Sequence, residues 1–341
     1  MRPPTTPLAD GYTLPPEWAE HERTLMAWPA RQTLWGARLE LARREYACCA
    51  NAIAAFEPVT MVCADQIAAA SARAALASAV DVIVMPLDDS WLRDSGPIFL
   101  LDGSGSRAGV HFRFNAWGEK YETWARDEAA GRALADRYSP VRYDAPLVLE
   151  GGSVITDGSG TLLTTEQCLQ SPSRNPGLGR AQLEKGLRDF LGVERTVWLR
   201  KGLADDVFTD VHVDFVAAFT APGELLLQSA PPDSEDFPAM EENCSRVEAA
   251  GLRVTEMPLL PEVDLGGEEF AASYLNFYLC NGAVVVPAVN ASTDEEAVEL
   301  IQAAFPDREA VPVPGEVLAW GGGGPHCITQ PVPRRPGRAT S

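Results

Sequence analysis

The chain has 341 residues, of which 46% are hydrophobic, so it can bury a sizeable core. Its 28 lysines and arginines against 48 aspartates and glutamates give a formal net charge of −20, which disfavours binding to nucleic acid or to an anionic membrane. No apolar run approaches the ~20 residues that a membrane span requires. The N-terminus lacks a signal-peptide pattern and the seven cysteines lack CxxC spacing. We therefore expect a reduced, cytoplasmic protein without structural zinc.

Helix-like and strand-like segments alternate along the chain. Helical patterns occupy residues 39–56, 66–79, 124–137, 180–191, 236–250 and 293–305. β-Branched runs at 81–85 and 196–199 predict strands between them. Turn signals between short apolar runs predict five hairpins, at Asp102-Gly103, Asp157-Gly158, Pro222-Gly223, Asn281-Gly282 and Pro314-Gly315.

The predicted unit is strand, helix, strand and hairpin, and it recurs about every 60 residues. Units that cannot bury their own apolar faces must stack, so this period indicates a solenoid or a propeller of the α/β class. An ordinary doubly wound α/β domain also alternates strands and helices, and periodicity alone leaves both architectures open.

A glycine-rich loop near the C-terminus carries the first candidate for chemistry. Four consecutive glycines, 321–324, precede His326 and Cys327. Because such a run costs backbone entropy, it indicates a close approach of the backbone to a ligand. We expect Cys327 to be an exposed thiolate, although a free cysteine in a flexible bend is the plainer alternative.

Two further segments carry acid–base groups. On a strand, His212 and Asp214 of Thr209-Asp-Val-His-Val-Asp214 would point to the same face. Glu150 stands in an apolar run before two glycines, where a buried carboxylate needs a cationic partner, and an imidazolium is a suitable one. A structural His–Asp pair and a glutamate on a solvent-facing edge strand are the alternatives.

An acidic segment, Asp88 to Pro97, offers Asp94 as a second carboxylate. Together, Asp94 and Asp214 could bind one guanidinium group through paired hydrogen bonds. Asp94, Glu150 and His212 each precede the first strand of a predicted hairpin, so an arrangement of the units around an axis would bring them together. Cys327 follows the last predicted hairpin and does not fit this position.

Seven motifs in order resemble the agmatine deiminases and the related bacterial peptidylarginine deiminases of the guanidine-modifying superfamily. They lie between about residues 11 and 333: Trp91-Leu-Arg-Asp-Ser-Gly-Pro97, Phe114-Asn-Ala-Trp-Gly118, Glu150-Gly-Gly-Ser153, Arg174-Asn-Pro176, His212-Val-Asp214, Ser273-Tyr-Leu-Asn-Phe277 and Gly321-Gly-Gly-Gly-Pro-His-Cys-Ile-Thr-Gln330. The resemblance implies one catalytic domain, 1–341, with a core at 11–333 and a flexible tail at 334–341. It implies a five-bladed α/β propeller with pseudo-fivefold symmetry.

The resemblance also implies roles for residues and a reaction that needs no metal or cofactor. Cys327 would be the nucleophile, His212 the general acid and base, and Glu150 the residue that orients His212. Asp94 and Asp214 would bind the guanidinium nitrogens, and Trp91 and Trp117 would line the pocket for the substrate tail. The expected reaction converts agmatine to N-carbamoylputrescine and ammonia through a covalent thiouronium. The partner would be this small cation, with a homo-oligomer left open.

The sequence departs from the family pattern near these motifs, at Phe208, Val211, Phe215, Glu119 and Gly324-Pro325. Phe208 occupies a position that is often acidic in the family, so another alkylguanidine is an alternative substrate. Three other functions stay open: an amidinotransferase, a cysteine peptidase and a catalytically inactive guanidine-binding protein.

Overall fold

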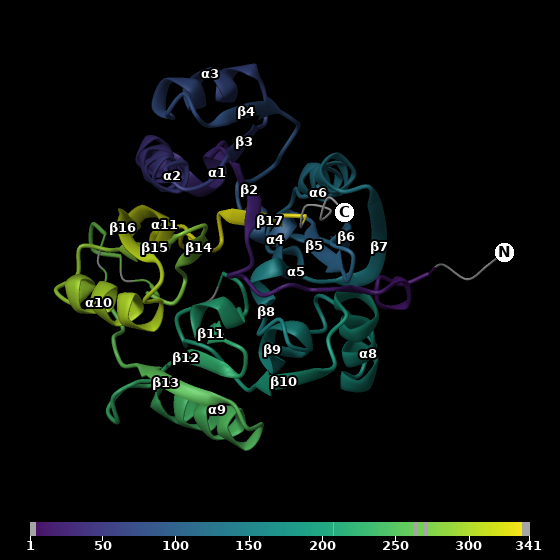
Figure 1. The fold of residues 1–341 in the computed structure, drawn as a ribbon. Coiled ribbons are helices and arrows are strands. Elements are labelled where there is room, and N and C mark those ends of the chain that lie inside the picture. Colours follow the sequence, from purple (N-terminus) through teal and green to yellow (C-terminus); the bar gives the residue numbers. More distant parts are fainter. Residues whose placement is uncertain are drawn as a thin grey trace.

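The computed structural model describes residues 5–206, 208–261, 263, 265–268, 270 and 272–335. These residues form an α/β fold of five small sheets, each flanked by helices (Figure 1). The α/β class predicted from the sequence is therefore confirmed. Of the predicted tail, residues 336–341 lie outside the described residues.

Four of the sheets follow the chain in sequence order. Their strands, in spatial order, are β1 (Tyr12–Thr13), β5 (Ile98–Asp102), β6 (Arg107–Arg113) and β7 (Val141–Val148); β10 (Arg195–Leu199), β9 (Thr161–Thr165) and β8 (Val154–Thr156); β11 (Ala217–Ala221), β12 (Glu224–Gln228) and β13 (Arg253–Met257); and β14 (Tyr278–Cys280), β15 (Ala283–Ala288) and β16 (Glu309–Pro314). Each contains an antiparallel hairpin whose second strand pairs in parallel with the strand after the next long helix. The repeated unit expected from the sequence is present in all four.

The fifth sheet joins the two ends of the described chain. Its order is β17 (Thr329–Pro333), β2 (His21–Ala27), β3 (Val59–Cys63) and β4 (Asp81–Val84), and β17 pairs antiparallel with β2. The hairpin predicted at Pro314-Gly315 is therefore wrong, because this turn leads from β16 into helix α11 (Glu316–Trp320). The antiparallel pair of this sheet comes from strands about 300 residues apart, which no local turn signal can indicate.

Six long helices connect parallel strands within the sheets. They are α2 (Leu39–Ile53), α3 (Gln66–Ala75), α6 (Ala125–Tyr138), α8 (Arg180–Leu191), α9 (Phe237–Ala249) and α10 (Asp294–Ala304), close to the predicted ranges. The short helical turns are η1 (Leu8–Asp10), α1 (Gln32–Trp35), η2 (Gly36–Arg38), α4 (Leu92–Ser95), α5 (Ala116–Glu119), η3 (Gly151–Ser153), α7 (Glu166–Leu169) and η4 (Val213–Phe215). None of these helices combines the length and apolar character that a membrane crossing requires, among the described residues.

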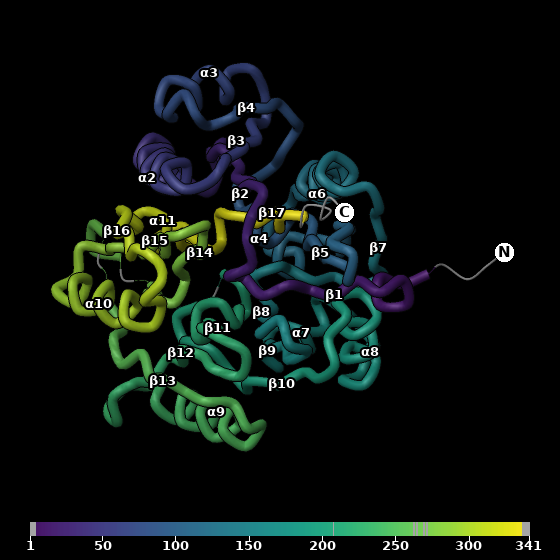
Figure 2. The backbone as a smooth tube through the Cα atoms, in the orientation of Figure 1, coloured from purple at the N-terminus to yellow at the C-terminus, as the bar shows by residue number. Residues whose placement is uncertain are grey.

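The segment between β1 and β2, residues 14–20, runs across the middle of the molecule (Figure 2). We call it the N-terminal strap. Its backbone is tied at both ends, because Leu14 donates a hydrogen bond to the carbonyl oxygen of Leu191 at 2.8 Å and Arg308 donates to that of Trp18 at 2.9 Å. The strap thus crosses over the ends of several units and brings its side chains to the centre.

Candidate active site

The candidate residues precede the first strand of the antiparallel pair in each sheet. Asp94 lies in α4 before β5, Glu150 just before η3 and β8, and His212 at the start of η4 before β11. Cys327 also fits this position, contrary to expectation, since β17 serves as the first strand of the fifth antiparallel pair. Asn276 occupies the equivalent position before β14. The fold thus brings one polar segment from every sheet to a common centre.

The segment around His212 is not the strand that we expected, although the His212 and Asp214 side chains both lie beside Gly152. Asp210 and Val211 have φ values of 58° and 71°, and Val213–Phe215 forms the single turn η4. A β-branched residue in the left-handed region is strained, and the surrounding contacts must stabilise it. The His212 backbone N–H donates to Thr209 Oγ1 at 3.0 Å. An irregular backbone, rather than the alternation of a strand, therefore brings both side chains toward Gly152.

Asp94 and Asp214 converge on the glycine pair that follows Glu150. A Cβ atom on Gly152 would lie 2.7 Å from Asp214 Oδ2, 2.7 Å from His212 Nδ1 and 2.9 Å from Asp94 Oδ1, so only glycine fits there. The Gly152 backbone N–H donates to Asp94 Oδ1 at 3.0 Å. Burial, the nearby Asp214 and Glu150 raise the pKa of Asp94 against the lowering effect of His212. The two carboxylates form a buried anionic centre suited to a planar cation.

Cys327 lies beside this centre as a buried thiol, not as the exposed thiolate that we expected. Its exposure is 2%, and Sγ is 3.6 Å from Asp214 Oδ2. Burial and the charges of Asp214 and Asp94 raise its pKa well above the usual value. A bound cation would offset both carboxylate charges and so favour the thiolate. The Cys327 backbone N–H donates to Asn276 Oδ1 at 3.3 Å, which fixes the residue.

The glycine run before Cys327 is required by neighbouring protein side chains, and two of its residues, Gly321 and Gly322, also line the pocket. A Cβ atom on Gly323 would lie 2.5 Å from the Trp91 ring, and one on Gly324 would lie 2.8 Å from Asn276 Oδ1. Gly322 has a φ of 98° and packs against Phe208. The run therefore lets the backbone pass close to the walls of the site.

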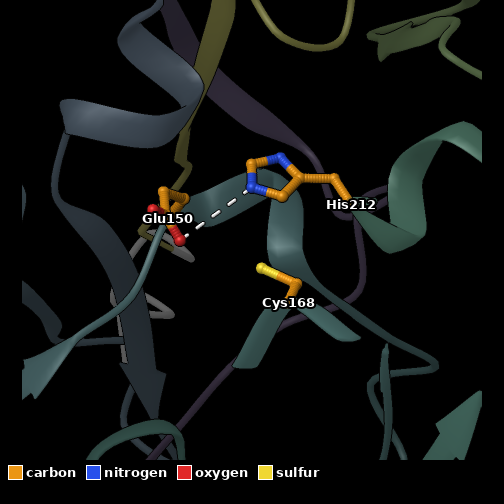
Figure 3. A group of neighbouring side chains, drawn as sticks. All are labelled: Glu150, Cys168 and His212. Carbon is orange, nitrogen blue, oxygen red and sulfur yellow. Dashed lines mark ion pairs between the residues drawn. The ribbon is translucent and has the colours of Figure 1, made fainter. Parts of the chain in front are cut away.

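His212 is wholly buried between two carboxylates. Its Nδ1 atom is 3.7 Å from Asp94 Oδ1, and its Nε2 atom is 3.9 Å from Glu150 Oε2 (Figure 3). Burial lowers the pKa of His212, but Asp94, a contact with Cys168 and Asp214 outweigh it and raise the pKa to about 10. His212 is therefore protonated at neutral pH and can donate a proton.

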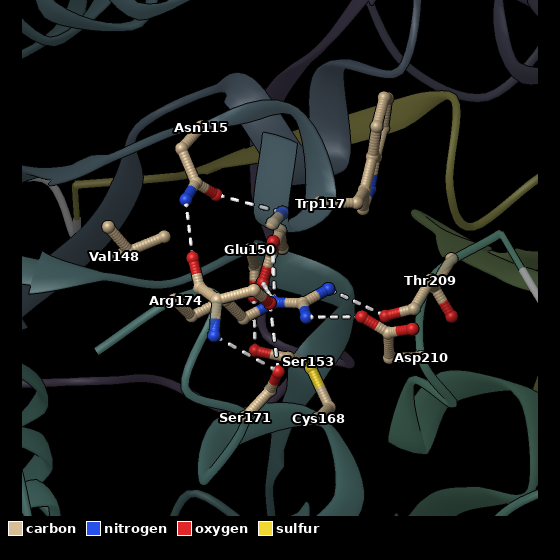
Figure 4. Close-up of polar contacts among 12 residues, drawn as sticks. Asn115, Trp117, Val148, Glu150, Ser153, Cys168, Ser171, Arg174, Thr209 and Asp210 are labelled. Atoms are coloured by element: carbon tan, nitrogen blue, oxygen red, sulfur yellow. Dashed lines mark hydrogen bonds and ion pairs between the residues drawn. The ribbon is translucent and has the colours of Figure 1, made fainter. Parts of the chain in front are cut away.

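Glu150 lies on the expected side of His212, but its hydrogen bonds go to Arg174. Arg174 Nε donates to both carboxylate oxygens, at 2.8 and 2.9 Å, and both side chains are fully buried (Figure 4). Arg174 also donates to Asp210 Oδ2 and to the Thr209 carbonyl oxygen, each at 2.7 Å. Arg174 thus connects Glu150 to the segment that carries His212, a role that the sequence motif did not reveal.

Cys168 is a neighbour of His212 that the sequence analysis missed. It follows β9 on α7, and Glu150, Cys168 and His212 have ligand-type atoms within 4.8 Å of one another (Figure 3). Thiol, imidazole and carboxylate are a donor set that zinc accepts. Here, however, Glu150 is already bound to Arg174, and the raised pKa of His212 keeps its ring cationic. The positive charges of Arg174 and His212 both oppose the binding of a metal ion. The cluster of Glu150, Cys168 and His212 is therefore better suited to hydrogen bonding.

Aromatic side chains, Trp91 and Trp117 among them, line a pocket together with Cys327. The pocket has an empty volume of about 280 Å³ and is also lined by Asp94, Tyr121, Phe208, Thr209, Gly321 and Gly322. Trp91 stacks on Trp35 at a centroid distance of 5.8 Å. Trp117 has a second role, because its Nε1 donates to Asp94 Oδ2 at 2.8 Å. Trp117 thus both lines the pocket and orients a carboxylate.

A second buried histidine, His326, lies on the other side of Asp214, and no sequence pattern pointed to it as a site residue. Its Nδ1 atom is 2.7 Å from Asp214 Oδ2, and its Nε2 atom is 2.7 Å from Glu17 Oε1 on the N-terminal strap. The structure thus brings together Asp94, Glu150, His212, Asp214 and Cys327, and it adds Arg174, Cys168, Asn276, His326 and Glu17 to them.

Comparisons with known proteins identify the family to which the chain belongs. Residues 13–333 match the family described as Porphyromonas-type peptidyl-arginine deiminase. The chain is 40% identical to an agmatine deiminase of Pseudomonas aeruginosa, over 98% of this chain and 99% of the relative, and 40% identical to one of Stutzerimonas stutzeri, over 96% and 97%. It superposes on a solved structure of the agmatine deiminase of Enterococcus faecalis with a TM-score of 0.91 and 32% identity, covering 98% and 99% of the two chains. The chain therefore belongs to the Porphyromonas-type peptidyl-arginine deiminase family.

Proposed function

We propose that this protein is a guanidine hydrolase that converts agmatine to N-carbamoylputrescine and ammonia. The observation that carries the proposal is the placement of the Cys327 thiol 3.6 Å from Asp214, one of two buried carboxylates, with His212 lying between Asp94, the other, and Glu150. The relatives named agmatine deiminase support the choice of agmatine. The product is a precursor of putrescine, which assigns the enzyme to polyamine biosynthesis.

Substrate binding would use the anionic centre. Asp214 Oδ1 is buried and has no hydrogen-bond partner among the described residues, so it can accept one N–H of a guanidinium. Asp94 is oriented by Trp117 and Gly152 and would accept another. Two fixed carboxylates hold a planar cation in one orientation and keep it charged, so that its carbon stays electrophilic.

The first half of the reaction transfers the amidino carbon to sulfur. Binding of the cation favours ionisation of the Cys327 thiol, whose proton passes to the solvent and returns when the product has left, and the thiolate attacks the guanidinium carbon and forms an S–C bond. His212 then gives its proton to one amino group, the C–N bond breaks, and ammonia leaves. The products are a thiouronium cation on Cys327, a neutral His212 and ammonia.

The second half releases the ureido product. Neutral His212 takes a proton from a water molecule that attacks the thiouronium carbon, and the C–S bond then breaks. The Cys327 thiolate and the protonated His212 are restored. The ureido product is released in a protonated form and then gives its extra proton to ammonia. Glu150 and Arg174 would hold the position of His212 through both steps.

Two features of the pocket favour a second candidate, the hydrolysis of an alkylguanidine with an uncharged tail. Phe208 lines the pocket at the position where the family is often acidic. Asp210, the carboxylate two residues after Phe208, is already paired with Lys120 Nζ at 2.7 Å and with Arg174 Nη1 at 2.7 Å, so its charge is engaged by these cations. Such surroundings give an ammonium group at the end of a substrate a weaker electrostatic partner than a carboxylate would.

We further propose that the five sheets are the blades of a propeller with pseudo-fivefold symmetry and form one catalytic domain, residues 1–341, that acts in the cytoplasm, with a homo-oligomer left open. The recurrence of an antiparallel pair and a parallel strand in every sheet supports this arrangement. It also gives a reason for the convergence of one segment per sheet on a single site.

The experiment is to incubate the purified protein with agmatine, arginine, an arginyl peptide and uncharged alkylguanidines, and to measure ammonia and ureido product, with Cys327→Ala as the control. Turnover of agmatine supports the first candidate, and preference for an uncharged guanidine supports the second. Formation of a new guanidine from an added amine, without ammonia, would identify an amidinotransferase. Normal turnover by Cys327→Ala would refute the covalent mechanism.

A further inference from the structure

We propose that Glu17 and His326 are positioning residues that hold Asp214 in the orientation needed to bind the guanidinium group. This inference rests on the proposed function, because it assigns a purpose to the geometry of Asp214. Neither residue touches the expected substrate position directly. Both act through Asp214, which binds the substrate, and Glu17 is supplied by the N-terminal strap rather than by any of the five sheets.

The three side chains form a continuous chain of short hydrogen bonds. Glu17 Oε1 is 2.7 Å from His326 Nε2, and His326 Nδ1 is 2.7 Å from Asp214 Oδ2. His326 is 3% exposed and Asp214 is 2% exposed, whereas the Glu17 side chain retains 26% exposure. Hydrogen bonds of this length between charged groups are stronger and more directional than those between neutral groups.

The charges of the three residues follow from their contacts. Burial and Arg93 lower the pKa of His326, but Glu17 and the two hydrogen bonds outweigh them and raise it. Burial raises the pKa of Glu17, but His326 and Arg93 outweigh it and lower that pKa to about 2. Glu17 is therefore a carboxylate that can only accept, so His326 Nε2 must carry a proton. With Nδ1 donating to Asp214, the ring is an imidazolium between two carboxylates.

The two carboxylate oxygens of Asp214 therefore have different roles. Oδ2 accepts from His326, whereas the buried Oδ1 has no partner among the described residues. Rotation of the carboxyl group would break the bond with His326, so Oδ1 is held free for an N–H donor from the substrate. The His326 charge also offsets part of the negative charge that raises the pKa of Cys327.

Arg93 fixes the far end of this chain. Its Nη1 atom donates to Glu17 Oε1 at 3.1 Å, and its Nε atom donates to the His326 carbonyl oxygen at 3.2 Å. The cavities around Glu17 and the pocket above Cys327 share no lining residue. Glu17 and His326 line one cavity together with Asp214, whereas Asp94 and Cys327 line the pocket with Trp91 and Trp117, so Glu17 can be changed without altering a residue that lines the latter pocket.

The first test is a kinetic comparison of Glu17→Gln and Glu17→Asp with the wild-type protein. Glutamine keeps the shape and removes the charge, so we expect kcat/KM to fall between about 10- and 100-fold, with most of the change in KM. Glu17→Asp keeps the charge and should recover part of the loss. Glu20→Gln is the matched control, because Glu20 lies on the same strap and pairs only with the exposed Arg334 in the described structure. Wild-type kinetics for Glu17→Gln would overturn the inference.

A double-mutant cycle separates positioning from a general structural effect. If Glu17 acts through His326, then Glu17→Gln should cost less than about twofold in a His326→Asn background. Independent, multiplicative losses would show that Glu17 does not work through His326 and would refute the inference. Absence of ammonia release by the wild-type protein from every guanidine would instead refute the proposed function, which keeps the two failures distinct.

A titration that needs no activity gives the second test. The chain has four histidines, so NMR signals of labelled imidazoles can be assigned with His326→Asn. The charged groups that face His326 are Glu17 on the strap, Arg93 on α4 and Asp214 on η4. Glu17→Gln removes the carboxylate that raises the pKa of His326, so this pKa should fall. An unchanged His326 titration would overturn the inference even if the variant were unstable or inactive.

Discussion

The two buried histidines of the site differ in how they are held. His326 has a carboxylate oxygen 2.7 Å from each ring nitrogen. His212 has no oxygen within hydrogen-bonding distance of either ring nitrogen among the described residues, since its nearest carboxylate oxygens are 3.7 and 3.9 Å away and its other polar contact is the weak one with the Cys168 thiol. A proton that must move twice in each turnover belongs on a loosely bound ring, whereas a fixed charge belongs on a tightly bound one. The difference separates the proton carrier from the positioning residue.

The largest effect on catalysis should come from replacing His212 and His326 one at a time. His212→Asn removes the proton donor, so kcat should fall by about 10²- to 10⁴-fold with a small change in KM. His326→Asn should act mainly on KM and by a smaller factor. Steady-state kinetics with the preferred guanidine measure both. Equal losses of kcat in the two variants would contradict the distinction between them.

The buried Glu150–Arg174 ion pair beside His212 should contribute more to the free energy of unfolding than the Glu17 contacts beside His326. Arg174→Met leaves Glu150 buried without its partner and should lower the free energy of unfolding by about 3 to 5 kcal/mol. Urea denaturation measures the loss. Adding Glu150→Gln to the variant should restore part of it, since no charge then remains unpaired. Glu17→Gln, at a partly exposed site, should change the unfolding free energy much less. A larger loss for Glu17→Gln than for Arg174→Met would contradict this difference between the two sides of the site.

The pH dependence of kcat should report the charge on His212. Its pKa is raised to about 10 from an ordinary 6.5, so the proton donor is present below that value and is lost as the pH rises through about 10. Asp94 is the strongest of the groups that raise it. In Asp94→Asn, the alkaline limb measured at saturating substrate should therefore move to lower pH, and substrate binding should weaken. A limb that stays near pH 10 would assign the titration to another group.

The smallest effect is expected at Cys168. Its contact with His212 is a neutral thiol contact, which contributes to the raised pKa of the ring. Cys168→Ser keeps a hydrogen-bonding group of similar size and should change kcat by less than about twofold, whereas Cys168→Ala should lower it by about 2- to 10-fold. The exposed Cys48, changed to serine, is the matched control. An inactive Cys168→Ser variant would show that the thiol itself takes part in the chemistry.

Sequence patterns that span only a few neighbouring residues predicted the helices well. The helix expected at 180–191 has these bounds in the structure, and Gly192 ends it with a φ of 69°. Asp94, Glu150, His212, Asp214 and Cys327 were identified because each lies in a recognisable motif. The strand expected at His212 failed because alternation of apolar and polar residues also occurs in an irregular segment, and positive φ values at non-glycine residues leave no trace in the sequence.

The contacts that the sequence did not reveal join residues far apart in the chain. Glu17 and His326 are 309 positions apart, and Arg174 and Glu150 are 24 positions apart, on either side of the β8–β9 hairpin. Glu17 stands in a proline-rich segment without periodic pattern, so nothing marks it as part of a site. A single sequence gives no information on such pairs, because only the tertiary fold decides which distant charges become neighbours.

The pairing of β2 with β17 has a consequence for how the protein acquires its activity during synthesis. Cys327 stands two residues before β17, so the nucleophile and the strand that closes the fifth sheet leave the ribosome together, after the other four sheets have been made. Until then β2 has a free edge on one side, which is a template for pairing with other chains. A nascent chain that lacks β17 therefore has neither nucleophile nor closed sheet, and aggregation competes with folding until both arrive.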